Sequence, residues 1–141
     1  MILGISAGYH DAAATVVDRH GDIVFAGHSE RYSKQKNDAH IDPGLLADLC
    51  DYDIDTVAYY ERPYMHNLQQ IYTGQRQLGP WTVKGALHKH LGAWYKRPAR
   101  RELAYSHHLS HAASGFQTSP FDRATVVVID AIGEWDTITI W

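Results

Sequence analysis

His107, His111 and Asp130 form the set of side chains in this sequence that is most able to bind a metal ion. The segment 107–116 contains alanines and no proline, and glycine appears only at Gly115, so it predicts a helix. Two histidines four residues apart lie on one face of such a helix, within reach of one cation. Asp130 follows the apolar stretch 124–129, which predicts a buried strand. We expect its carboxylate to be the third ligand.

Two imidazoles and one carboxylate are typical of non-haem iron sites, and zinc or manganese bind similar sets. The sequence has ten histidines, so a pair at helical spacing also arises by chance. The alternative without a metal is that His107 and His111 are a solvated or core-capping pair and that Asp130 caps a turn.

The elements that must position these residues predict an α/β domain. Three antiparallel strands open the chain, and the turn 18–21 between the second and the third has the composition of a tight hairpin. Asp42-Pro43 then begins a short helix, and a parallel strand follows it. The expected strands are 2–6, 12–18, 22–28, 54–60, 102–106, 124–130 and a last one from about 135.

The middle of the chain, at about 62–101, predicts a peripheral helical insert. Its apolar residues recur at helical intervals between Trp81 and Tyr95. The basic cluster Lys96-Arg97 and Arg100-Arg101 either binds a phosphate or a partner, or is a solvated surface. The last residues, 136–141, alternate like a strand whose apolar edge needs a cover. We therefore expect this chain to be completed by more polypeptide or by a partner chain.

Length and charge restrict the function further. A chain of 141 residues suits one domain, and its net charge of −3 argues against binding to a nucleic-acid backbone. The single cysteine excludes an internal disulfide. The sequence shows no basic-then-apolar leader and no apolar stretch long enough to span a membrane, so we expect a cytoplasmic protein without membrane contact.

Two glycine-bearing turns, 4–12 and 130–137, are candidate phosphate-binding loops. Glycine lets an anion approach backbone N–H groups, although in a hairpin it often serves only the turn. Two such hairpin turns in one α/β domain are typical of the actin-like ATPase and sugar-kinase superfamily. Kinases of that group carry Asp in the first loop, where this chain has Ser6. The kinase interpretation is therefore the weaker one.

Five motifs in order resemble the amino-terminal domain of the nodulation-factor and aminoglycoside O-carbamoyltransferases. That domain is also similar to the tRNA threonylcarbamoyladenosine-modifying proteins. The motifs lie at 2–14, 29–38, 107–112, 119–121 and 130–134. The resemblance implies an α/β half-domain of the actin-like ATPase or ribonuclease H-like fold, with a mixed sheet, flanking helices and the remainder of the fold outside this chain.

The resemblance also implies an activity. The family makes a carbamoyl-adenylate from carbamoyl phosphate and ATP in a separate carboxy-terminal domain, and transfers the carbamoyl group to a hydroxyl of a small molecule or nucleotide. It binds iron or a related metal through the residues that match His107, His111 and Asp130, and a fourth ligand lies beyond Trp141. This chain departs from the family at Ala131, where glycine is usual, and at Asn37, where histidine is frequent.

The remaining candidate roles belong to residues in or near the matched motifs. His10 is a candidate catalytic base or phosphate ligand, with Asp11 orienting it or capping the turn. His108 contacts the substrate or packs. Arg31, Lys36 and Gly133 are candidates for phosphate or nucleotide contacts, and Glu134 for supporting the metal ligands. Two alternatives remain open, namely a non-catalytic metal- or nucleotide-binding module and a sugar or acyl kinase.

Overall fold

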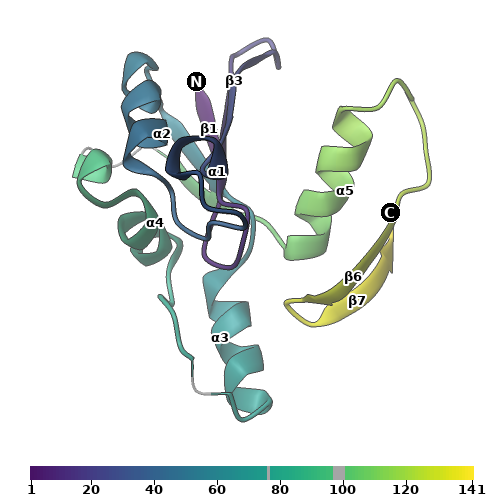
Figure 1. Cartoon of the computed structure of the whole chain (residues 1–141). Helices are drawn as coiled ribbons and strands as arrows, with labels where there is room; N and C mark the ends of the chain where they lie inside the picture. Colours follow the sequence, from purple (N-terminus) through teal and green to yellow (C-terminus); the bar gives the residue numbers. More distant parts are fainter. Residues whose placement is uncertain (76, 97–100) are drawn as a thin grey trace.

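Five strands form one mixed sheet in the computed structural model, which describes residues 1–75, 77–96 and 101–141 (Figure 1). Its order is β3-β2-β1-β4-β5, in which β1 runs antiparallel to β2 and parallel to β4. The strands are β1 (Ile2–Ser6), β2 (Ala13–Val17), β3 (Ile23–His28), β4 (Thr56–Tyr59) and β5 (Arg101–Ala104). The expected α/β class, with three antiparallel strands and then a parallel one, is confirmed.

The turn between β2 and β3 is the tight hairpin that the sequence predicts. The Asp18 carboxylate accepts hydrogen bonds from the backbone N–H groups of His20 and Asp22. Gly21 has a φ of +91°, a conformation that glycine adopts without steric cost. Beyond β3 the charged segment 30–37 contains the short helix α1 (Glu30–Ser33).

Helix α2 (Pro43–Asp48) connects the antiparallel strands to β4. The Asp42 side chain accepts a hydrogen bond from the Gly44 N–H, and Pro43 occupies the first helical position, so the predicted start of this helix is confirmed. The short 3-10 helix η1 (Leu49–Asp51) follows α2.

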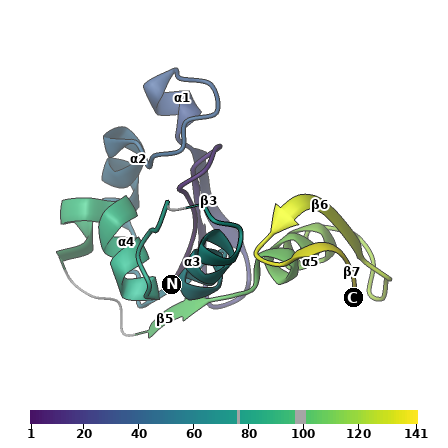
Figure 2. The same ribbon diagram turned by 90° about the horizontal axis from the view of Figure 1, so that it is seen from below.

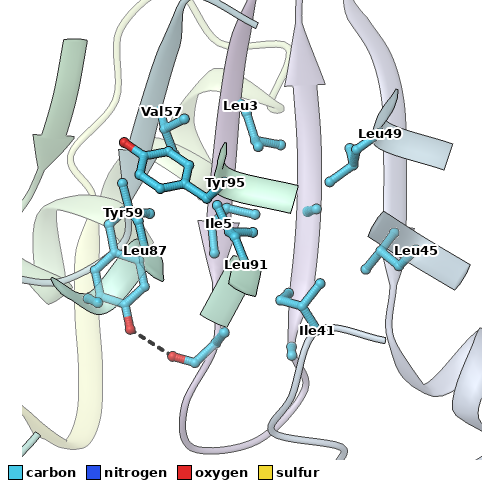
Figure 3. Close-up of a cluster of buried hydrophobic side chains, with 14 of the residues drawn as sticks. Leu3, Ile5, Ile41, Leu45, Leu49, Val57, Tyr59, Leu87, Leu91 and Tyr95 are labelled. Carbon is cyan, nitrogen blue, oxygen red and sulfur yellow. Dashed lines mark hydrogen bonds between the residues drawn. The ribbon is translucent and has the colours of Figure 1, made fainter. Parts of the chain in front are cut away.

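One face of the sheet carries the hydrophobic core (Figure 3). Leu3, Ile5 and Val57 from the strands meet Leu45 and Leu49 from α2 and η1. The described part of the segment 62–101 is helical, as predicted, and comprises α3 (Pro63–Tyr72), α4 (Val83–Leu91) and η2 (Gly92–Lys96).

The peripheral position expected for this segment is wrong for α4 and η2. Leu87, Leu91 and Tyr95 are fully buried in the same core as Leu3 and Ile5. The helical spacing of these residues defines an apolar face, but it does not reveal that the face covers the main sheet.

Helix α5 (His107–Gln117) and the hairpin of β6 (Val127–Gly133) and β7 (Asp136–Ile140) lie on the other side of the sheet from α2 and α4 (Figures 1 and 2). The prediction of a buried strand here is wrong, because β6 and β7 form a separate two-stranded sheet. Ile129 is 75% exposed and Val127 54%. No third strand or helix of the described chain covers that face of the hairpin.

Part of the predicted basic cluster lies outside the described chain. Arg97 and Arg100 are outside the described residues, whereas Arg101 begins β5.

Among the residues that the structure describes, no helix has the length and apolar character needed to cross a membrane.

Replacing Leu45 with alanine should lower the free energy of unfolding by about 2 to 5 kcal/mol, because a fully buried leucine leaves a cavity in the core. Leu68→Ala on α3 is the matched control. Its side chain is 44% exposed, so it should change the free energy of unfolding by only about 0.5 kcal/mol. Urea denaturation of both variants provides the measurement, and equal effects would contradict the assigned core.

Candidate metal centre

The first turn of α5 is attached to the carboxyl end of β4. The Tyr105 N–H donates to the Tyr59 carbonyl at 3.2 Å, and the Ser110 hydroxyl donates to the Tyr60 carbonyl at 2.7 Å. These two bonds fix the start of the helix beside the sheet. The predicted helix is confirmed, and its first residue is His107.

His107, His111 and Asp130 converge on one point. The Asp130 Oδ2 lies 3.0 Å from the His107 Nε2 and 3.8 Å from the His111 Nε2, and the two Nε2 atoms are 3.0 Å apart. Ligand atoms bound at about 2.1 Å around a tetrahedral ion lie about 3.4 Å from one another. The separations bracket this value. The donor set therefore fits a divalent cation. The three side chains lie together as expected, and metal binding by them stays a prediction.

A bulge in β6 directs the Asp130 carboxylate toward the helix. Ile129 pairs with Ile138 and Gly133 with Asp136, so three residues of β6 face only Thr137 of β7. The Ala131 N–H donates to the Asp130 Oδ1 at 2.7 Å, which leaves Oδ2 for the histidines. The sequence predicted Asp130 at the end of a strand, whereas it lies inside β6.

Gly133 allows α5 and the hairpin to approach closely. A Cβ atom at this position would lie 2.5 Å from the His108 Cδ2 and 2.8 Å from the His107 Cδ2. The buried His108 ring shares a hydrogen bond with the Thr139 hydroxyl at 2.8 Å. This position matches the packing alternative for His108. Its catalytic role and the nucleotide contact of Gly133 stay predictions.

Glu61 stands behind His107, on the side away from Asp130. Its Oε2 lies 3.7 Å from the His107 Nδ1, a buried atom without a hydrogen-bond partner among the described residues. The Glu61 carboxylate, and then that of Asp130, hold the pKa of His107 above its usual value against the effect of burial. Burial, and next the charge of His107, lower the pKa of His111. An imidazole between two carboxylates is typical of metal-binding histidines.

The hairpin is held to the rest of the protein by Glu134. This buried carboxylate accepts hydrogen bonds from the Arg62 backbone N–H at 2.7 Å, from Nε at 3.0 Å and from Nη2 at 2.5 Å. The carboxylate raises the pKa of Arg62. Glu134 supports the site through Arg62 rather than through a histidine.

A cavity of about 260 Å³ lies next to this centre. Its lining joins the β1–β2 turn to the helical segment and includes Gly8, Tyr9, Glu61, His66 and His90. Glu61 therefore lines the cavity and also contacts His107. Burial lowers the pKa of His66 and lowers that of His90 to about 4, so both imidazoles are neutral at pH 7.

Four predicted residues lie away from the metal ligands. His10 is exposed, and its Nδ1 is 2.8 Å from the Asp11 Oδ2, which is the orienting contact that we expected. Arg31 and Lys36 are exposed on α1 and the loop after it. Their roles toward phosphate or nucleotide, and those of His10 and Asp11, stay predictions.

Glu61 and Arg62 were not among the residues predicted from the sequence. Both follow β4 after Tyr60, and the carboxyl ends of strands are where ligands bind in open α/β sheets. That rule offered a signal for two charged residues after an apolar strand. Their partners, His107 and Glu134, are too distant in sequence for any local pattern to identify.

Known proteins resemble this chain over most of its length. The sequence profile described as Carbamoyltransferase N-terminus matches residues 1–141. The uncharacterized protein sll1178 of Synechocystis sp. is 33% identical over 99% of this chain and 27% of its own length. The nodulation protein NolNO of Sinorhizobium fredii is 29% identical over 89% of this chain and 20% of its own length. The chain thus spans about a quarter of these relatives or less.

We expect acid to destabilise the fold through His90. Its folded-state pKa of about 4 lies below the ordinary 6.5, so the unfolded chain binds the proton more readily between these values. This contribution to stability is complete above pH 6.5 and is lost as the pH falls toward 4. His90→Phe keeps an aromatic ring stacked on Tyr59 and removes the titration.

Thermal unfolding of the wild type and of His90→Phe at several pH values tests this expectation. The melting temperature of the wild type should fall more steeply than that of the variant between pH 6.5 and pH 4.5. Parallel curves would show that His90 does not couple folding to protonation.

Proposed function

The chain belongs to the carbamoyltransferase amino-terminal domain family, and we propose that it supplies the metal-binding part of an O-carbamoyltransferase. The observation that carries the proposal is the convergence of His107, His111 and Asp130, with 3.0 to 3.8 Å between their ligand atoms. We propose iron as the metal, with zinc or manganese as substitutes that suit the same donors.

The reaction proposed is transfer of a carbamoyl group from carbamoyl-adenylate to a hydroxyl. We propose a small molecule or a nucleotide as the acceptor, and the net charge of −3 argues against a nucleic-acid backbone. We propose that carbamoyl phosphate and ATP are consumed in a part of the protein beyond this chain. The order of antiparallel and parallel strands and the two hairpin turns support the actin-like ATPase or ribonuclease H-like half-domain that we propose as the fold.

The residues of the candidate metal centre have different proposed roles. A divalent cation held there supplies Lewis-acid stabilisation of the charge that develops on the carbamoyl oxygen. Asp130 adds negative charge beside both imidazoles, and Glu61 holds the Nδ1 side of His107. Fixed neighbours on both sides keep the His107 ring in one orientation, so that its Nε2 faces the shared point.

The cavity beside Glu61 is the proposed acceptor site. It is lined by the neutral imidazoles of His66 and His90, and the His66 ring hydrogen-bonds the Tyr9 hydroxyl. A neutral imidazole accepts the proton that a hydroxyl loses when it attacks a carbonyl carbon. Glu61 connects this cavity to the metal ligands, so an acceptor bound there lies next to the centre.

Replacing His111 with alanine should abolish stoichiometric metal binding and carbamoyl transfer together. His111 is 56% exposed, so its removal should leave the fold intact. The measurement is metal content by mass spectrometry, combined with carbamoyl transfer from carbamoyl phosphate and ATP by the complete protein. His20→Ala, in the exposed β2–β3 turn, is the matched control and should retain both properties.

Full transfer activity in a His111→Ala protein without bound metal would refute the proposal. Release of ADP with transfer of the γ-phosphoryl group of ATP to the acceptor would instead identify a kinase. Metal bound at one ion per centre without any transfer to hydroxyl compounds would indicate a binding module.

A further inference from the structure

A second cluster of metal-ligand types lies where β2, β3 and α1 meet. Ala13 pairs with His28 across the β2–β3 ladder, and the Ser29 N–H donates to the Ala12 carbonyl at 2.8 Å. Asp11, just before β2, is thereby brought beside His28, the last residue of β3, and Glu30, the first residue of α1. The local backbone pairing alone creates this grouping.

The two carboxylates lie near different nitrogens of the His28 ring. The Asp11 Oδ1 lies 3.8 Å from the Nε2, and the Glu30 Oε1 lies 3.9 Å from the Nδ1. One ligand atom from each residue lies within 4.8 Å of those from the other two. All three side chains are half-buried, so bound water or a ligand oxygen can reach the same ion.

One feature of the cluster points to a ligand. The His28 Nδ1 is buried and has no hydrogen-bond partner among the residues described, although such an atom normally has one. Asp11 has a φ of +54°, a left-handed conformation that aspartate in turns adopts more readily than most residues other than glycine. This conformation directs the residue between His10 and His28.

The charge of the cluster also favours a cation. Two carboxylates face one imidazole, and the described cationic side chain near them is Arg31, which is 79% exposed and lies 3.7 Å from Glu30. An exposed arginine at that distance compensates little of the repulsion between carboxylates. A divalent ion would neutralise both.

We propose that Asp11, His28 and Glu30 form a second divalent-cation site, separate from the one at His107. One imidazole and two carboxylates suit Mn²⁺, Fe²⁺ or Zn²⁺. The ion would tie the β1–β2 turn, whose Gly8 and Tyr9 line the cavity, to the beginning of α1. The inference does not depend on carbamoyl transfer.

The experiment counts Mn²⁺ bound to the complete protein after removal of metals with a chelator. Electron paramagnetic resonance detects free Mn²⁺ during a titration, and mass spectrometry gives the ions retained per chain. His28→Gln should bind one ion fewer than the wild type, while it keeps the ion that His111→Ala loses. His20→Gln makes the same change in the exposed β2–β3 turn and should bind as many ions as the wild type.

Glu30→Gln provides a second variant that preserves side-chain shape, and it should weaken the same ion at least tenfold. Binding equal to the wild type in both variants would overturn the inference. That result would leave the His107 centre untouched. Conversely, loss of the His28 ion alone supports the second site even if His111→Ala retains its metal.

Discussion

The pairing of Arg62 with Glu134 is the interaction on which the candidate metal centre depends. Arg62 follows the sheet strand β4, and Glu134 occupies the turn of the β6–β7 hairpin, where its φ is +57°. A carboxylate is costly to bury unless it is paired and hydrogen-bonded, and Arg62 supplies three donors. The pair therefore sets the distance between the hairpin, which carries Asp130, and the sheet, to which α5 is attached.

Local backbone structure then orients the ligands within the elements that this pairing holds together. The bulge in β6 gives Asp130 a direction that regular alternation along a strand would not provide. Ser110, bonded to Tyr60, holds the helix from the other side. The three ligands thus come from two elements, His107 and His111 from α5 and Asp130 from β6, and the cation-binding geometry follows from how these elements meet.

Much of the fold could be predicted from the sequence because its signals are local. The turn at Asp18–Gly21, the helix start at Asp42-Pro43 and the histidine spacing on α5 all depend on neighbours within a few residues. Burial could not be predicted in this way. The β-branched stretch before Asp130 correctly predicts a strand, yet Ile129 is exposed, since burial depends on what covers a strand.

The site was predicted to a similar extent. His107, His111 and Asp130 were recognisable because two lie one helical turn apart and the third ends an apolar stretch. Glu61 and Arg62 were not, because their side-chain partners are 46 and 72 residues away and reveal themselves only after folding. The cluster of His28 with Asp11 was missed for the same reason.

The contact of Gly133 with the rings of His107 and His108 has a consequence for genetics. Any side chain at this position would clash with both imidazole rings, so the helix and the hairpin would have to move apart. In a random mutagenesis screen, substitutions of Gly133 should therefore fall in the same phenotypic class as substitutions of the ligands, although glycine offers the ion no donor.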